Sequence, residues 1–191
     1  DGLALKHLSE ELQADREVVL RAVRQNGMAL AFAHRLLAAD KQVVLKAVAH
    51  NGDALQFASD ALQADREVVL AAVVKGAKCL RFAPRALTAD MDFLLQAIAR
   101  NSRCIWQVPG ALLEDRGFAE AAVQMNGLAL QGLPVPFRED RCMVMLAVEQ
   151  NGLALEYAAD LLKADREVVL AAVAQRGHAF QHASLELRSS E

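Results

Sequence analysis

A 25-residue repeat constrains this chain more than any other feature. One aspartate recurs every 25 residues, at Asp15, Asp40, Asp65, Asp90, Asp115, Asp140 and Asp165. Taking it as position 1 defines seven full copies, which begin at those residues, and residues 1–14 supply the second half of an eighth. A fixed period of roughly 20–50 residues is typical of solenoids and related arrays. We therefore predict a single repeat domain over residues 1–191.

The apolar columns of the repeat predict helices. Position 8 is alanine in every full copy, position 9 is valine or isoleucine, and position 16 is leucine, isoleucine or phenylalanine. Positions 5, 8 and 9 share one face of a helix. Aspartate is a good N-cap, so position 1 should open this helix. Asn-Gly follows at positions 12 and 13 of four full copies, and we expect the glycine to end the helix in the left-handed conformation.

The second half of each copy predicts two shorter elements. Positions 14–19 read as a short helix, and position 20 begins a one-turn helix because it holds residues that favour helix starts. These residues are Ser9, Ser59, Ser184, Pro84, Pro109 and Pro134. The fold class is therefore all-α: an α-solenoid whose copies contain a longer helix, a short helix and a one-turn helix. A single copy cannot bury its own apolar face, so neighbouring copies must stack.

Composition narrows the environment. The chain is 54% hydrophobic, yet no apolar run approaches the roughly 18 residues of a membrane span. Three cysteines are too few and too odd for a disulfide framework, which favours a reducing, intracellular compartment. The first residues show no signal or transit peptide, but the chain begins inside a repeat, so this is compatible with an organellar leader upstream. Cys79 and Cys104 replace alanines at position 15 and are interpreted as small packing residues.

The motif of the repeat resembles a catalogued family. One copy reads Asp65-Arg66-Glu67-Val68-Val69-Leu70-Ala71-Ala72-Val73, and another reads Asn151-Gly152-Leu153-Ala154-Leu155-Glu156-Tyr157-Ala158. These segments are similar to a "domain of unknown function" repeat that occurs in tandem arrays. The resemblance covers essentially the whole chain and implies no activity. Leucine-rich variant repeats, which alternate an α-helix with a shorter helix, are a looser architectural likeness.

Several patterns invite a chemical interpretation, and each has a structural one. The seven aspartates resemble an acidic ladder, but helix capping explains all of them. The aromatic residues of position 18 could stack on bases or form a seam between copies, and we favour the seam. His178 and His182 lack a third metal ligand. No phosphate-binding loop, nucleophile elbow or metal signature is present, so we predict no enzyme activity, no cofactor and no metal.

Function should lie in the variable positions, because repeated positions build the core of a solenoid. Positions 11, 14 and 17 vary most in chemistry. In the third and fourth copies they hold five cations and the only tryptophan: Lys75, Lys78, Arg81, Arg100, Arg103 and Trp106. A solvated charged face is the ordinary interpretation. Trp and Arg dominate binding hot spots, which favours a functional surface instead.

The sequence therefore predicts a non-catalytic protein-interaction or scaffolding solenoid, as a part of a larger assembly. Apolar residues continue to both ends of the chain, which suggests end-to-end or oligomer contacts. The net charge of −3 gives no global attraction for nucleic acid. The alternative is a nucleic-acid-binding repeat protein that uses the basic patch, with Trp106 stacking on a base.

Overall fold

The computed structural model describes residues 1–189, and helices are the only regular secondary structure over that range. The chain is 79% helical, which confirms the predicted all-α solenoid. It divides into two compact units, the first being Asp1–Phe93 and the second starting at Leu94. The prediction of one continuous domain stays a prediction, and each unit is described by itself.

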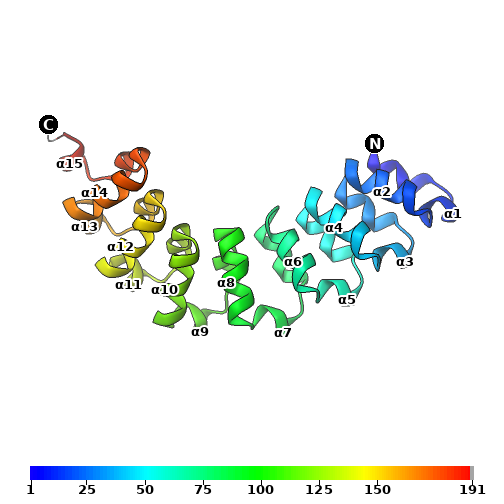
Figure 1. The fold of residues 1–191 in the computed structure, drawn as a ribbon, viewed down its shortest axis with the longest axis horizontal. Helices are drawn as coiled ribbons and strands as arrows, with labels where there is room; N and C mark the ends of the chain where they lie inside the picture. Colours follow the sequence, from blue (N-terminus) through cyan, green and yellow to red (C-terminus); the bar gives the residue numbers. More distant parts are fainter. Residues whose placement is uncertain (190–191) are drawn as a thin grey trace. The chain divides into compact units, whose positions relative to one another are not determined.

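Each full copy contains three helices, as predicted (Figure 1). The long helices are α2 (Arg16–Gln25), α4 (Lys41–His50), α6 (Arg66–Val73), α8 (Met91–Arg100), α10 (Arg116–Met125), α12 (Arg141–Gln150) and α14 (Arg166–Gln175). The short ones are 3-10 helices: η1 (Gly2–His7), η2 (Gly27–Phe32), η3 (Gly52–Phe57), η4 (Ala77–Phe82), η5 (Ser102–Gln107), η6 (Gly127–Gly132), η7 (Gly152–Tyr157) and η8 (Gly177–His182). The one-turn helices are α1 (Glu10–Gln13), α3 (Arg35–Ala38), α5 (Asp60–Gln63), α7 (Arg85–Thr88), α9 (Gly110–Leu113), α11 (Val135–Glu139), α13 (Asp160–Lys163) and α15 (Leu185–Ser189).

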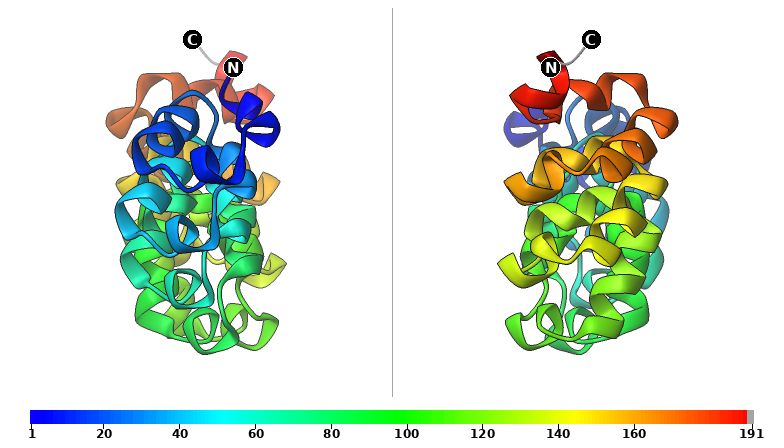
Figure 2. Two further views of the ribbon diagram at one scale, coloured as in Figure 1. Left: turned by 90° about the vertical axis from the view of Figure 1, so that its right-hand side faces the viewer. Right: turned by 90° about the vertical axis from the view of Figure 1, so that its left-hand side faces the viewer.

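Equivalent helices of neighbouring copies pack side by side within each unit. In the first unit α2 packs on α4 and α4 on α6, while η1 to η4 form a second row. In the second unit α10, α12 and α14 form one row and η5 to η8 the other. The end-on views of Figure 2 show successive copies of each unit lying one behind another. The core of each unit lies between its two rows.

The apolar columns fill this core. The position 8 alanines from Ala47 to Ala172 are fully buried. The position 16 residues from Leu30 to Leu155 are at most 1% exposed. Both columns are therefore buried, as the sequence predicted. Close packing of this kind leaves little room for a change of volume.

The aspartate caps are confirmed in all seven copies. In each, the carboxylate accepts a hydrogen bond from the backbone N–H of position 4, at 2.7–3.3 Å. Asp65 additionally accepts from Glu67 at 2.9 Å. These bonds satisfy donors that a helix N-terminus otherwise leaves free. The aspartates are thus structural residues, as expected from their place in the repeat.

The predicted ends of the long and short helices need correction. The long helix ends at position 11 in six copies and at position 9, Val73, in the third. The asparagine of position 12 is extended, with φ −149° and ψ 111° at Asn26. The Asn26 side chain caps the next helix instead, accepting from the Met28 N–H at 3.0 Å. That helix is a 3-10 helix over positions 13–18, one position earlier than predicted.

The predicted left-handed glycine was wrong, and the reason is packing. Within residues 1–189 no residue has a positive φ. A Cβ added at Gly27 would lie 2.3 Å from the carbonyl oxygen of Ala47 in the next copy. At Gly127 it would lie 2.2 Å from the Ala147 oxygen. Glycine at these positions therefore lets η2 and η6 approach the next long helix more closely than a side chain would permit.

The predicted serine caps at position 20 are correct in place but mostly wrong in chemistry. Ser9 and Ser59 precede one-turn helices without a side-chain cap bond, and only Ser184 Oγ accepts one, from the Leu187 N–H at 3.4 Å. The backbone makes the conserved contact instead. The Ser59 N–H donates to the carbonyl of Ala38 in the preceding copy at 2.9 Å. Proline at this position in the third to fifth copies cannot make that bond.

Ion pairs connect neighbouring copies. The cation of position 2 forms an ion pair with the second carboxylate oxygen of the next copy's aspartate. Each such aspartate therefore both caps its own helix and pairs with the preceding copy. The pairs are Arg16–Asp40, Lys41–Asp65, Arg66–Asp90, Arg116–Asp140 and Arg141–Asp165, at 2.6–2.8 Å. Position 2 of the fourth copy is Met91, which has no charge to offer.

These pairs predict acid sensitivity. The Arg16 guanidinium is the largest cause that lowers the pKa of Asp40 below 3.8, and the Lys41 ammonium does the same for Asp65. Because the folded pKa is lowered, the stabilisation is present above the unfolded pKa of about 4 and is lost as the pH falls below it, through the lowered pKa values. Urea midpoints measured from pH 7 down to about pH 2.5 should therefore drop at the acid end.

Asp65→Asn is the control variant for this prediction. Asparagine is also a good N-cap, so the variant should lose the charge pair and keep the cap. We expect a loss below about 1 kcal/mol at pH 7, because the pair is partly exposed. The variant should also show a shallower acid transition. Identical acid transitions in both proteins would contradict a role for the pair.

Candidate functional site

The 3-10 helices give the variable positions a common direction. A 3-10 helix has 3.0 residues per turn, so side chains three apart lie directly above one another. Positions 14 and 17 therefore form one ridge on each of these helices. The ridge of η4 carries Lys78 and Arg81, and that of η5 carries Arg103 and Trp106. All four side chains are exposed.

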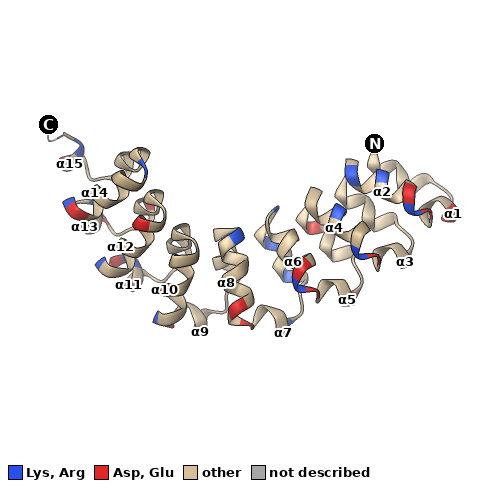
Figure 3. Ribbon diagram, in the orientation of Figure 1, with Lys and Arg blue, Asp and Glu red and all other residues tan. Residues whose placement is uncertain are grey.

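The first unit holds the predicted residues of the third copy. Lys75, Lys78 and Arg81 are exposed, and none makes an ion pair within residues 1–189. The Arg81 guanidinium lies over the Phe82 ring, 4.5 Å from its centroid, which is a cation–π distance. Figure 3 shows the cations of this segment in blue. This part of the chain therefore offers positive charge that no described residue neutralises.

The second unit holds the predicted residues of the fourth copy. Trp106 is 60% exposed, and Arg100 and Arg103 are exposed as well. Arg100 donates to the carbonyl of Gln96 at 3.3 Å, which orients its guanidinium along α8. Asn101 caps η5 by accepting from the Arg103 N–H at 3.1 Å, so the ridge starts from an ordered turn.

The boundary between the two units separates the six residues into these two trios. Each trio lies within its own copy: Lys75 follows α6 and Arg100 ends α8, and the ridges of η4 and η5 hold the other four residues. The prediction that all six form one patch stays a prediction.

Position 11 has a structural role that the sequence analysis missed. His50 accepts a hydrogen bond from the Gly27 N–H at 3.2 Å, and Gln150 and Gln175 accept equivalent bonds at 2.6 and 2.7 Å. These side chains satisfy the first N–H of the preceding copy's 3-10 helix. The sequence signal for this role was a hydrogen-bond acceptor at position 11 of one copy and a glycine at position 13 of the copy before. Lys75 and Arg100, which cannot accept such a bond, occupy copies that do without it.

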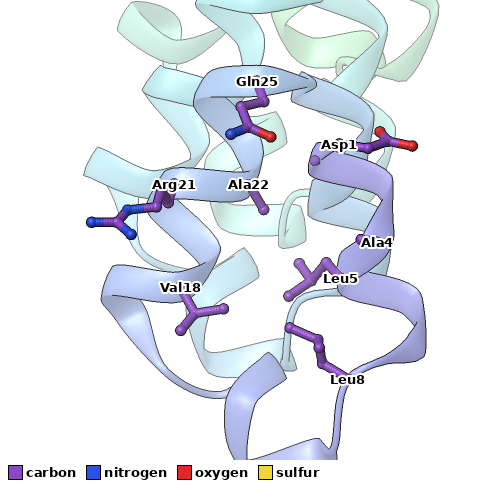
Figure 4. A pocket seen from close by; sticks show the side chains of 9 residues that line it. Asp1, Ala4, Leu5, Leu8, Val18, Arg21, Ala22 and Gln25 are labelled. Carbon is purple, nitrogen blue, oxygen red and sulfur yellow. The ribbon is translucent and has the colours of Figure 1, made fainter.

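The hollow at the start of the chain is a packing surface of the repeat. It is lined by Leu5, Leu8, Val18 and Ala22 among others, with Arg21 and Gln25 at its edge (Figure 4). Ala22 is partly exposed there, whereas its equivalents in later copies are fully buried. The lining therefore has the chemistry of a contact between copies.

The remaining candidates for chemistry offer little. Cys79 and Cys104 are buried, Cys142 is exposed, and none of these three cysteines forms a disulfide with another described residue. Burial raises the pKa of Cys79 to about 12, which disfavours the thiolate and nucleophilic chemistry. No group of three metal-ligating side chains occurs within residues 1–189, and His178 is exposed at the surface. The aromatic residues of position 18 from Phe32 to Tyr157 are half-buried, as a seam between copies requires.

The fold and the surface together define an α-helical repeat protein in which variable positions 14 and 17 form ridges on the 3-10 helices. A family model matches it in five stretches, residues 1–37, 40–88, 65–113, 115–160 and 140–188. This family is described as Domain of unknown function (DUF4116), and the chain belongs to it. No curated protein and no solved structure matches the chain. Over the described residues, no helix has both the length and the apolar character needed to span a membrane.

Proposed function

We propose that this chain is a non-catalytic interaction solenoid that binds an acidic segment of a protein partner through its basic ridges. The observation that carries the proposal is the η5 ridge, where an exposed tryptophan stands one helical turn from an exposed arginine. A tryptophan offers a large apolar area and an N–H donor to a partner. Trp and Arg are also the residues that contribute most at protein interfaces.

Charge supports the choice of partner. Five of the six position 2 cations are engaged in ion pairs between copies, whereas Lys75, Lys78 and Arg81 are not. The chain as a whole carries −3, so its attraction for an acidic segment must be local. At physiological salt such attraction extends about 8 Å, which is enough for direct contact and too short for capture from a distance.

Nucleic acid is the second candidate, favoured by the same tryptophan, since an aromatic ring can stack on any base. A phosphate backbone would use the cations and make the affinity fall steeply with salt. The two partners are therefore separated by a salt titration of the native complex.

The test uses two variants against the partner recovered from the native source. Arg103→Glu reverses the charge on the ridge, and Trp106→Ala removes its apolar area. Each should weaken binding by about 2 kcal/mol or more with folding intact. Lys46→Glu is the control, because Lys46 is an exposed cation on a long helix away from the ridges. Unchanged affinity for both ridge variants would show that these residues form a solvated surface and do not bind the partner.

A further inference from the structure

Beyond its basic end, the second unit presents a longer surface on the same row of helices. We propose that the ridges of η5, η6 and η7 form one surface for an extended peptide, acidic where it meets Arg103 and apolar over Leu128 and Leu153. This inference rests on the proposed function and specifies its partner. The surface is called the ridge surface below.

The ridge surface is continuous because its helices touch. η5 packs on η6, and η6 packs on η7. A side-chain bond also joins the first two, from Gln131 Nε2 to Ser102 Oγ at 3.1 Å. Position 14 therefore presents Arg103, Leu128 and Leu153 in a row. The two leucines are half-buried, so each offers an apolar surface held in place by its own helix.

Charge gives the ridge surface a direction. Arg103 stands at its first ridge, and exposed Glu156 stands at position 17 of its third. Both act on the Tyr157 hydroxyl: burial is the main cause that raises the pKa of Tyr157, Glu156 adds to it and Arg103 opposes it. Arg103 and Glu156 thus place opposite charges on the first and third ridges. An acidic partner residue is attracted at Arg103 and repelled at Glu156.

Spacing gives the partner its pattern. Packed helices lie about 8–10 Å apart, and a peptide in the extended polyproline II conformation advances about 3.1 Å per residue with three residues per turn. Successive ridges should therefore meet every third residue of a bound peptide. The expected partner is an extended segment with one acidic residue followed at every third position by a leucine or a similar apolar residue, and with no acid at the far end.

Synthetic peptides test this pattern directly. The first probe is Asp-Ser-Gly-Leu-Ser-Gly-Leu-Ser, labelled with a fluorophore and titrated with the full chain by fluorescence anisotropy. The second probe has the same composition but places both leucines beside the aspartate. The first should bind at least about tenfold more tightly, because it alone brings the acid and both leucines onto their ridges together. Equal binding of both probes, or no binding of the first, would overturn the ridge surface.

Variants assign the binding to particular ridges. Leu128→Gln and Leu153→Gln should each weaken the first probe by about tenfold, with an unchanged circular-dichroism spectrum. Met28→Gln is the control, since Met28 occupies the same position of the repeat and is also half-buried, but lies in the first unit. It should leave the affinity unchanged.

The outcomes separate this inference from the proposed function. If Arg103→Glu abolishes binding of the native partner while both leucine variants bind it and the first probe normally, the ridge surface is wrong and the basic ridges still bind an acidic partner. If neither the native partner nor the first probe responds to Arg103→Glu, both proposals fail.

Discussion

Replacing Gly127 with alanine is expected to destabilise the protein by about 3 kcal/mol. The added Cβ would lie 2.2 Å from the carbonyl oxygen of Ala147 and 3.1 Å from the backbone nitrogen of Asn151. Both contacts are to backbone in the next copy, so no flexible side chain can move aside. The two helices would have to separate, which opens the core between copies. Overpacking of a dense core typically costs about 1–3 kcal/mol, and a backbone clash belongs at the upper end.

Gly76→Ala is the matched control. Gly76 has φ −175°, an extended conformation that any residue adopts, and nothing lies within 4 Å of a Cβ built there. Alanine at this site should leave stability unchanged or raise it by up to about 1 kcal/mol, because it restricts the unfolded chain. Urea unfolding followed by circular dichroism measures both variants. Equal effects of the two substitutions would show that the close approach at Gly127 does not determine stability.

Replacing Leu155 with alanine is expected to cost about 2–5 kcal/mol. Leu155 is fully buried in the position 16 column of the second unit. Its removal gives up the apolar burial of the side chain and leaves a cavity that rigid helices on either side can fill only partly. Because each copy contacts only its neighbours, the loss should also make unfolding less cooperative.

Phe180→Ala tests whether burial causes the effect. Phe180 occupies the same position in the last copy, but it is 43% exposed. Although phenylalanine is the larger residue, its truncation should cost less than that of Leu155, since much of its surface already meets water. Both variants can be compared by their urea midpoints and slopes. A larger loss at Phe180 than at Leu155 would contradict the proposed core column.

The sequence by itself determined the fold class and most of the core. The aspartate period of 25 residues located every copy, and all seven aspartates cap the helices expected of them. The alanine and leucine columns predicted which side chains are buried, because an apolar residue with helical spacing has one face available for packing. The sequence also predicted the exposed positions of the third and fourth copies, because residues that vary between copies are not constrained by the core.

Only the tertiary structure decided how one copy fits the next. Gly27 looks like a helix stop when its own copy is considered, yet the carbonyl of Ala47 in the next copy excludes a side chain there. Likewise, Gly132 stands in an aromatic column, where a Cβ would lie 2.3 Å from the side chain of Ile105 in the preceding copy. Periodicity describes the direction in which a side chain leaves its own helix, and it carries no information on the distance from that helix to the helix of the next copy. Contacts between copies depend on that distance, which the packed helices set together.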